Sequence, residues 1–435
     1  MRNGLPSASL FENARFNALV VVPNALQGLF RRRRAAVAAA TRADVDRWAV
    51  GLLTRMRRGY DGGPVWVRVI TDPALLVLSR PDVKRVLAGS PDPFAADPPA
   101  KKKGMSHFQP DALTISRGEA WSNRRRFTEA VLDTGKPEHR LAERMRAVCA
   151  EEAEALVAGI GVEGGRLGWD EWQAAFRRLV RRVVLGDRAR DDEELTELLA
   201  TLMSEANSLP GEPSESFEPF MSGLRGYVSD PEPGSLCGLI AEAPHDEETD
   251  VAGQIPHWLF ASHDTLAINA LRALALIASH ERQRERVIDE LAAAERSYLE
   301  ACLEEAMRLW PTTPMLSRET LEEVEWNGDT VAPGTQVLIV NTFMHRDRER
   351  VEYADRFAPE EWVEGTAAED WAFNQFSHGP QGCPGAGTAL YLGTAFLAEL
   401  LGACAVRLRS PKLDPTKPLP HMLDFFGIEL ELDRR

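Results

Sequence analysis

The spacing of apolar residues predicts a chain that is mainly helical. Apolar residues recur with the period of an amphipathic helix over nine long segments. These segments are 43–58, 80–89, 118–132, 137–159, 169–185, 191–207, 251–280, 281–309 and 386–405. Strand-like runs are short and lie near both ends of the chain, at 65–70, 74–79, 335–341 and, with a weaker pattern, 425–432. The pattern therefore predicts a mainly α fold with a small β region.

The sequence shows no internal repeat and no low-complexity linker. Two stretches rich in proline and glycine, LPGEPSES (209–216) and SDPEPGS (229–235), separate predicted helices. Such stretches are typical of loops over a surface or a pocket. We therefore expect a single domain over residues 43–435, preceded by an N-terminal extension, residues 1–42.

Composition and cysteine usage favour a soluble, cytoplasmic protein. The chain has 435 residues, 44% of them hydrophobic, which is enough for a substantial core. Its five cysteines are odd in number and widely spaced, which argues against a disulfide framework or a zinc site. An apolar patch at 16–30 is interrupted by polar residues and proline, well short of a membrane span. We expect no membrane partner.

The net charge argues against nucleic-acid partners, although three local runs of basic residues occur in the acidic chain. A net charge of −15 argues against nucleic acid as a partner. Basic runs persist at Arg31–Arg34, Lys101–Lys103 and Arg124–Arg126. Runs of this kind are commonly solvated faces, and otherwise they are docking patches.

The stretch FNQFSHGPQGCPGAGTAL (373–390) holds one cysteine, Cys383, among glycines and prolines. Glycines let the backbone pass close to a bulky, flat partner, and a proline after the cysteine fixes the chain direction before the next helix. Amide hydrogens and a helix N-terminus near the sulfur favour its thiolate form. A single thiolate suits an axial metal ligand. A buried cysteine beside a glycine-rich turn is the alternative, and a phosphate cradle fits less well because no Gly-Lys-Ser/Thr follows.

The spacing of Phe376, Gly379, Cys383 and Gly385, FxxGxxxCxG, resembles the cysteine loop of the cytochrome P450 superfamily, the haem-thiolate monooxygenases. The resemblance runs from about residue 43 to the C-terminus. It implies the cytochrome P450 fold, haem b (iron protoporphyrin IX) as cofactor and Cys383 as the iron ligand, with haem buried between the 251–280 helix and the cysteine loop. In this family the thiolate pushes electron density that favours O–O cleavage.

Two further segments follow in the family's order. In LEEAMRLWP, Glu305 and Arg308 form an ExxR pair three residues apart, on one helix face. The resemblance implies that this pair holds the scaffold of the cysteine loop. The segment 346–362 resembles the part that supplies a third, usually basic, partner, although Glu361 stands where arginine is frequent.

The long apolar segment 258–280 carries an acid and a hydroxyl, Asp264 and Thr265. Burying them is costly unless they contact water, each other or a ligand. The segment resembles the family's distal helix, whose acid–alcohol pair lies over the haem and manages protons. Ser262 occupies a position where glycine is typical. The alternatives are a solvated helix face for Asp264 and a hydroxyl bonded to the preceding helical turn for Thr265.

Haem carries two propionates, and the resemblance implies residues that meet them. Trp121 and Arg125 lie four apart on one helix face, in the family's WxxxR arrangement. Arg318 matches the arginine that follows the ExxR helix. Gln381 occupies a place where arginine or histidine is frequent, and it can donate a neutral hydrogen bond.

The activity that the resemblance implies is insertion of one oxygen atom into a small, mostly apolar organic molecule, with Asp264 and Thr265 relaying protons. We expect electrons from a ferredoxin and ferredoxin reductase, because the sequence shows no flavin domain and no iron–sulfur cysteine cluster. Arg124 and Arg126 are candidates to dock an acidic ferredoxin. Two alternatives stay open: a haem-thiolate enzyme of different outcome, coupling or peroxide-driven, and a non-catalytic haem-binding or sensor protein.

Overall fold

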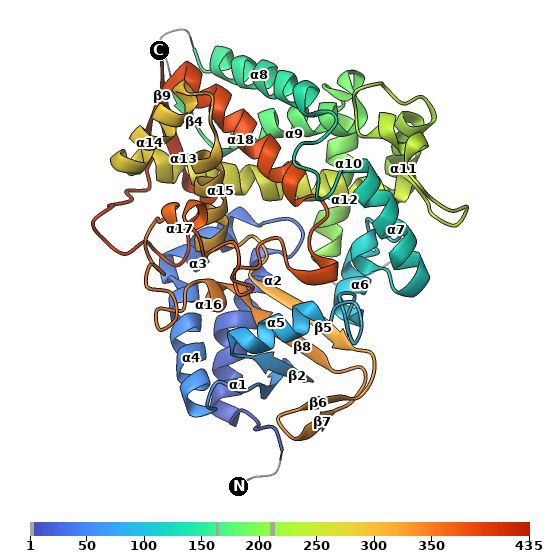
Figure 1. The fold of residues 1–435 in the computed structure, drawn as a ribbon, viewed down its shortest axis with the longest axis vertical. Helices are drawn as coiled ribbons and strands as arrows, with labels where there is room; N and C mark the ends of the chain where they lie inside the picture. The colour runs from blue at the N-terminus through green and yellow to red at the C-terminus, as the bar shows by residue number, and fades with distance from the viewer. Residues whose placement is uncertain (1–3, 162–164, 209–213) are drawn as a thin grey trace. The chain divides into compact units, whose positions relative to one another are not determined.

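A computed structural model describes residues 4–161, 165–208 and 214–435 (Figure 1). The chain divides into two compact units, each assembled from separate stretches of sequence. Unit 1 comprises Met1–Lys102, Met307–Cys383 and Lys417–Asp424, and unit 2 comprises Lys103–Ala306, Pro384–Thr416 and Phe425–Arg435. The predicted domain boundary at residue 43 stays a prediction, and residues 1–42 fall in unit 1.

A five-stranded sheet forms the centre of unit 1. Its order is β1-β2-β8-β5-β3, antiparallel except for the parallel pair β2 and β8. Apolar and β-branched residues fill the central strands and are buried on both faces. The strands are β1 (Val65–Val69), β2 (Asp72–Val77), β3 (Phe94–Ala95), β5 (Met315–Thr320) and β8 (Gln336–Val340), with a hairpin of β6 (Val324–Trp326) and β7 (Asp329–Val331).

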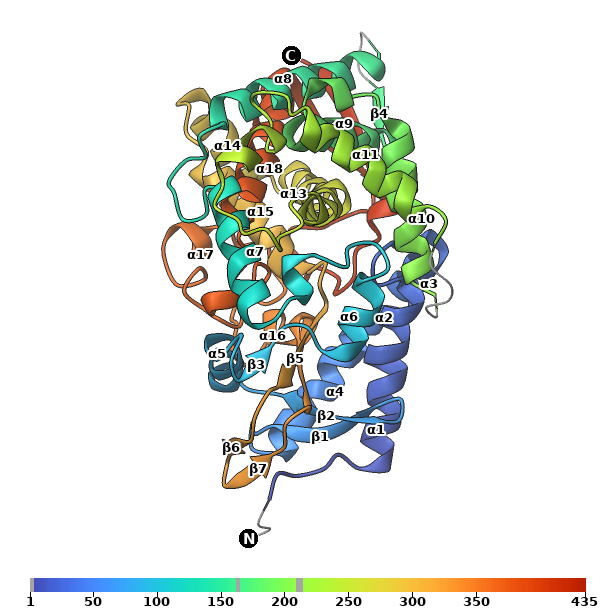
Figure 2. The same cartoon turned by 90° about the vertical axis from the view of Figure 1, so that its right-hand side faces the viewer.

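Helices cover this sheet, and the N-terminal ones are tied to its edge. Phe16 and Val20 enter the same apolar core as the strands. The side chain of Asn17 donates to the Arg68 carbonyl of β1 at 2.8 Å. Figure 2 shows α1 beside β1. The helices of this unit are α1 (Leu10–Phe16), α2 (Val22–Gln27), α3 (Arg34–Ala43), α4 (Val45–Gly59), α5 (Arg80–Ala88), α16 (Asn341–His345) and α17 (Glu360–Val363).

Unit 2 is built around α13 (Ala267–Ser279), an almost wholly buried helix that Figure 2 shows nearly end-on. Trp172 donates from Nε1 to the Ala267 carbonyl at 2.8 Å and fixes α9 against the start of this helix. The other helices are α7 (Gly118–Val131), α8 (Ala142–Gly159), α9 (Trp169–Leu185), α10 (Glu193–Ala206), α11 (Phe217–Ser229), α12 (Ile255–Phe260), α14 (Glu281–Ala292) and α18 (Ala386–Ala403). Strands β4 (Gly165–Leu167), β10 (Glu429–Arg434) and β9 (Cys404–Ser410) form an antiparallel sheet in that order. Two helices, α6 (Pro99–Met105) and α15 (Ser297–Leu309), contain the sequence boundaries between units.

The mainly helical prediction is confirmed, with local differences that have physical causes. The predicted helix 281–309 is two helices, because Ala294 adopts a left-handed φ of 60° between α14 and α15. The predicted helix 386–405 ends at Ala403, and β9 begins at the next residue. Residues 229–235 contain the expected loop between α11 and the next helical turn, whereas residues 209–213 of the other predicted loop lie outside the described residues.

Several elements were not predicted. The helices α1 and α2 were missed because asparagines and a proline interrupt the apolar pattern. Helix α11 follows a proline-rich stretch, and β5 has no regular alternation of buried and exposed residues. Their formation depends on tertiary contacts, such as the pairing of β5 with β8, that a local pattern does not encode.

Within the described residues, one helix, α18, has a length and composition that would let it cross a membrane, and half of it is buried. Core packing in unit 2 uses this apolar surface. Tyr391 on α18 donates from its hydroxyl to the Ala142 carbonyl of α8 at 2.8 Å. Both views show α18 running alongside α8 (Figures 1 and 2).

One buried carboxylate joins α8 to α9, and its removal is a test of the packing of unit 2. Glu152 is fully buried and accepts hydrogen bonds from Arg178, Arg182 and Arg190, which hold the pKa of Glu152 below its usual value although burial alone would raise it. Glu152→Ala leaves these cations without their shared partner and should lower the free energy of unfolding by about 3 kcal/mol in urea titrations. Glu154→Ala, at an exposed position of the same helix, is the control and should change it by less than about 0.5 kcal/mol. Equal effects of the two substitutions would contradict the assignment.

Candidate functional site

The cysteine loop closes on itself in unit 1. The Cys383 amide donates to the Phe376 carbonyl at 2.7 Å, and the Gly382 amide donates to the Gly379 carbonyl at 2.9 Å. Cys383 is exposed, and the other four cysteines of the chain are buried. Burial raises the pKa of the Cys237 thiol to about 12 and also raises those of Cys149 and Cys404. Cys383 therefore provides the accessible sulfur.

The need for glycine is strict at one position of this loop. Gly379 has a φ of 70°, and a Cβ there would lie 2.4 Å from the Leu87 carbonyl oxygen at the end of α5. Both observations exclude a side chain. Gly385, directly before α18, has a φ of −93°, a conformation that any residue adopts. The sequence predicted that glycine would let the backbone of this loop approach a partner closely. In the structure Gly379 approaches the backbone of Leu87 in this way.

Arg308 organises the chain beneath the loop. Its guanidinium donates to four backbone carbonyls, those of His345, Tyr353, Ala354 and Arg356, at 2.9 to 3.3 Å. The guanidinium also lies over the ring of Phe373, the first residue of the loop stretch, at 5.8 Å from its centroid. Arg308 is fully buried, as is Glu305 one helical turn earlier on α15. The arginine therefore has the scaffolding position that the ExxR resemblance implies.

The sequence reasoning missed the histidine that connects Arg308 to the cysteine loop. His345 Nδ1 lies 3.2 Å from the Arg308 carbonyl oxygen, and the Asn374 amide donates to His345 Nε2 at 3.2 Å. A ring nitrogen that accepts a hydrogen bond requires the neutral imidazole. Burial, and then the charge of Arg308, lower the pKa of His345 to about 3. Next to it, the buried Arg346 donates to the Leu309 carbonyl at 3.1 Å and to the Asp355 carboxylate at 2.6 Å.

Two cations, the buried Arg318 and the half-buried Lys101, lie near each other beside the loop. Arg318 on β5 donates to the hydroxyls of Ser90 and Ser377 at 3.1 and 3.3 Å, and burial lowers its pKa to about 10. Burial, and then the charge of Arg318, lower the pKa of Lys101 to about 7, while Asp97 opposes this shift. The hydrogen-bond acceptors recorded for the Arg318 guanidinium are neutral oxygens. A place with excess positive charge inside the protein fits an anionic group of a ligand.

Gln381 has an unpartnered side-chain oxygen in the described structure, whereas Arg125, a predicted propionate contact on α7, is paired with an acid. The Gln381 Oε1 atom is buried and has no hydrogen-bond partner in the described structure. Trp121 and Arg125 both lie on α7, and Arg125 donates from Nε to Glu129 Oε1 at 2.6 Å, so its charge is shared with a neighbour. Arg124 is bound to Asp111 and Ser116 at 2.8 Å and is largely buried. The expectation that Arg124 is a docking charge is therefore wrong.

In unit 2, the predicted acid–alcohol pair lies where the helix changes its winding. The segment between α12 and α13, Ala261–Leu266, is a π-helical turn. Insertions of this kind are frequent at functional sites, because they redirect side chains and free backbone groups. Asp264 accepts a hydrogen bond from Gln173 Nε2 on α9 at 2.8 Å. The described residues include no hydrogen-bond partner for the Thr265 hydroxyl, so the predicted alternative, a bond to the preceding turn, is not observed.

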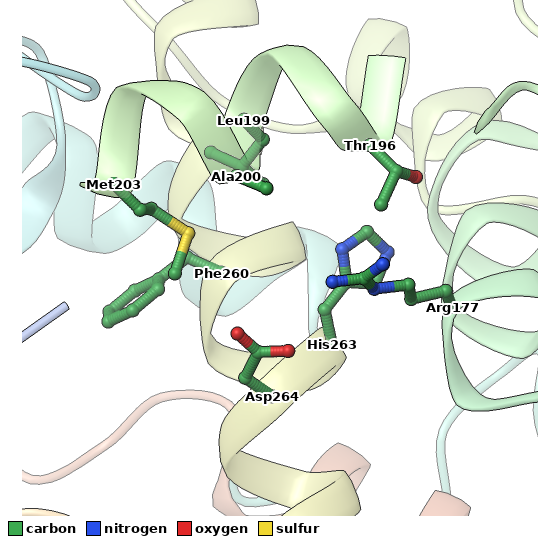
Figure 3. Close-up of a pocket in the computed structure, with 8 residues that line it drawn as sticks. All are labelled: Arg177, Thr196, Leu199, Ala200, Met203, Phe260, His263 and Asp264. Atoms are coloured by element: carbon green, nitrogen blue, oxygen red, sulfur yellow. The ribbon is translucent and has the colours of Figure 1, made fainter. Parts of the chain in front are cut away.

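Asp264 points into a pocket between three helical elements of unit 2 (Figure 3). The pocket is small, with a cavity volume of about 10 Å³, and it is partly open to solvent. His263 is buried beside Arg177, and its Nε2 has no hydrogen-bond partner in the described structure. Burial, and then the charges of Arg177 and Arg181, hold the pKa of His263 well below its usual value. The lining residues are Arg177, Thr196, Leu199, Ala200, Met203, Phe260, His263 and Asp264.

The structure thus brings the predicted residues together in two groups. Phe376, Gln381 and Cys383 belong to one loop of unit 1, and Arg318 is bonded to that loop at Ser377. Asp264 and Thr265 lie in the π-helical turn of unit 2. Unit 2 also contains α7, which carries Trp121 and Arg125. His345 and Gln173 were missed from the sequence, whereas Arg346 was named only within the segment 346–362 and Lys101 only within a basic run. The dipeptide His345–Arg346, placed soon after a predicted strand, was a usable signal; the distant Gln173 offered none.

Comparison with known proteins identifies the fold first. The solved structure of a cyanobacterial protein titled "Retinoic acid bound cyanobacterial CYP120A1" matches with a TM-score of 0.72. The match covers 88% of this chain and 94% of that chain at 18% sequence identity. The fold is therefore the cytochrome P450 fold, as the sequence predicted.

The sequence comparisons then give the family. The profile of the family "Cytochrome P450" matches residues 239–425, the stretch with the π-helical turn, the ExxR pair and Cys383. A probable cytochrome P450 4s3 of Drosophila melanogaster is 29% identical over 177 residues, 39% of this chain and 34% of that protein. Cytochrome P450 4c3 of the same organism is 27% identical over 169 residues, 35% of this chain and 32% of that protein. The chain therefore has the cytochrome P450 fold, and its stretch 239–425 matches the cytochrome P450 family.

Two consequences follow from these matches. Cytochrome P450 proteins bind iron protoporphyrin IX, so the match over residues 239–425 indicates haem as the cofactor. The matched region spans about a third of the length of the curated relatives.

The link through His345 predicts how stability depends on pH. The unfolded chain takes up a proton near the ordinary histidine pKa of 6.5, whereas the folded protein does so only near pH 3. Stability is therefore lost as the pH falls below 6.5, and this group alone should cost about 2 kcal/mol at about pH 5 relative to neutral pH. His345→Gln, which does not titrate there, should reduce the pH dependence of the unfolding free energy by that amount. His245→Gln, at an exposed position, is the control. An unchanged pH dependence for His345→Gln would refute a neutral, buried imidazole.

Proposed function

We propose that this protein is a haem-thiolate monooxygenase that inserts one oxygen atom from O2 into a small, mostly apolar organic substrate. One observation carries the proposal: the exposed Cys383 ends a loop whose spacing matches the family motif and whose Gly379 tolerates no side chain. The reaction balances when one oxygen atom enters the substrate and the other leaves as water, with two electrons and two protons consumed.

The residues of unit 1 fit haem. Cys383 would ligate the iron as its thiolate, and the Cys383 amide bond to Phe376 fixes where the sulfur leaves the backbone. Arg318, with Lys101 beside it, would hold a propionate carboxylate, which compensates buried positive charge. The unpartnered Oε1 of Gln381 sits on the same loop. When bound, haem would supply the iron at which O2 is activated.

The protein side of the proton supply involves Asp264 and Thr265. The Asp264 carboxylate is held by Gln173 and faces a pocket that is partly open to solvent, so water there can exchange protons with it. The Thr265 hydroxyl, one residue on, can hold a water molecule or pass a proton, because no protein group in the described residues occupies it. The neutral His263 offers a further hydrogen-bonding nitrogen in the same pocket. Trp121 and Arg125 stay candidates for the second propionate.

For electron supply we propose a ferredoxin and ferredoxin reductase. An acidic partner needs exposed basic side chains, and Arg126 on α7 is exposed, whereas Arg124 is not available. We also propose that the enzyme acts in the cytoplasm, in keeping with the spacing of its cysteines.

The ligand assignment is tested by spectroscopy. The reduced protein with carbon monoxide should show the absorption band characteristic of thiolate-ligated haem, and Cys383→Ala should abolish that band. Cys404→Ala removes a buried thiol and should leave the band in place, so it is the matched control. A band that survives Cys383→Ala would sink the assignment, and a band with no oxygen-dependent product from any substrate would favour a haem-binding sensor.

The proton assignment is tested by product formed per reducing equivalent consumed. Thr265→Ala should keep haem content and divert electrons to peroxide, because protons are no longer delivered in order, while Thr265→Ser should retain coupling. Asp264→Asn should slow turnover by roughly 10²-fold, as for other acid–base groups. Full coupling in Thr265→Ala would show that the relay runs elsewhere, with Ser262 and His263 the nearest candidates.

A further inference from the structure

The N-terminal helical run exposes an apolar face. The helices α1 and α2 and the π-helical turn Asn17–Val21 between them form one continuous run from Leu10 to Gln27. Every exposed residue between positions 10 and 29 is apolar. We call six of these exposed residues the apolar stripe: Phe11, Ala14, Ala18, Val22, Leu26 and Leu29.

The stripe faces outward because the polar side chains of the run are used inward. Asn13 donates to the Ala8 carbonyl at 2.9 Å, Asn17 to the Arg68 carbonyl and Asn24 to the Val20 carbonyl at 2.8 Å. Glu12 accepts from the Tyr60 hydroxyl at 2.7 Å. The opposite side is fixed as well, since Phe16 and Val20 lie in the core of unit 1. The run therefore cannot bury its stripe by rotating.

Several side chains of the stripe are more than half exposed to solvent. Phe11 is 68% exposed, Leu26 59% and Leu29 61%. Ile70, 61% exposed, lies close to the helical run, because its amide donates to Asn17 Oδ1 at 2.7 Å. In the described part of the chain, five of the nine large exposed apolar side chains lie between positions 10 and 29. Clusters of this kind mark interaction surfaces.

Charge identifies the kind of partner. Residues 1–60 carry eleven arginines and three acidic residues, a net charge of +8 in a chain whose net charge is −15. Arg31, Arg33 and Arg34 are exposed directly beyond the stripe. At its other end, the Arg15 guanidinium lies 5.4 Å from the centroid of the Phe11 ring. The apolar stripe is thus bracketed by cations.

We propose that the apolar stripe and the arginines Arg31, Arg33 and Arg34 dock this protein on the surface of an anionic lipid bilayer. A helix of about 18 residues is about 27 Å long and can lie flat in the interface with its apolar side among the acyl chains. Each basic side chain near an anionic surface adds about 1 kcal/mol. A second copy of this chain is a poorer partner, because the exposed arginines beyond the stripe, Arg31, Arg33 and Arg34, would face those of the other copy and repel them. Surface docking requires no membrane-spanning segment, and it replaces the expectation of no membrane partner.

The test is sedimentation of the full-length protein with vesicles. Vesicles of phosphatidylcholine with about one third phosphatidylserine should bind the protein at about 0.1 M salt. Binding should be at least about tenfold weaker with phosphatidylcholine alone or at about 0.5 M salt. The double variant Phe11→Glu, Leu26→Glu should bind at least about tenfold more weakly at low salt. Leu321→Glu, which changes an exposed leucine of unit 1 outside the stripe, is the matched control and should bind as the wild type does.

Arg31→Glu with Arg34→Glu should weaken binding to anionic vesicles and leave any binding to neutral vesicles unchanged. Wild-type protein that binds neither kind of vesicle would overturn the proposal without any variant. Equal binding of the stripe variant and the Leu321→Glu control would also overturn it. A wild-type dimer in light scattering that the stripe variant dissociates would assign the stripe to a second copy instead.

Discussion

The buried guanidinium of Arg308 is the interaction on which the cysteine loop depends. A charged group without water needs several acceptors, and this one has four backbone carbonyls from the stretch 345–356. Carbonyls fixed in this way hold an irregular stretch that no sheet or long helix stabilises. The same stretch carries His345, whose neutral ring accepts the amide of Asn374 at the start of the loop. The position of Cys383 therefore depends on a hydrogen-bond chain that begins at the buried Arg308 guanidinium and reaches the loop through His345 and Asn374.

Arg318 is buried to a similar extent but is balanced differently. It donates to two hydroxyls and one carbonyl, and Lys101, whose charge Asp97 partly offsets, lies nearby. Arg308 is compensated by the protein, whereas the Arg318 region keeps an electrostatic cost that an anion can relieve. A ligand that relieves such a cost binds the folded chain selectively and stabilises it. Under the proposed propionate contact, cofactor affinity and fold stability are coupled through the same two side chains.

The sequence predicted those parts of the site in which backbone constraint and chemistry share one short stretch. Gly379 and Cys383 are four residues apart, and their spacing reflects both the clash with Leu87 and the place of the sulfur. Gln173 could not be predicted, because its bond to Asp264 joins residues 91 positions apart and exists only once α9 packs on the π-helical turn. Arg124 was misread for the same reason: a basic run looks identical whether or not an acid such as Asp111 folds against it.

The N-terminal run shows a related limit of local patterns. Its asparagines break the apolar periodicity, so the sequence did not predict a helix, yet in the structure Asn13 and Asn17 bond to backbone of the run and of the neighbouring strand. Because these asparagines point inward and bond to backbone groups, the residue types at the outward-facing positions of the run are not determined by the fold of the run. At those positions the chain has phenylalanine, valine and leucine where solubility alone would favour charge. The apolar face is therefore best explained by contact with another apolar phase, and the arginines that bracket it give that phase an anionic surface.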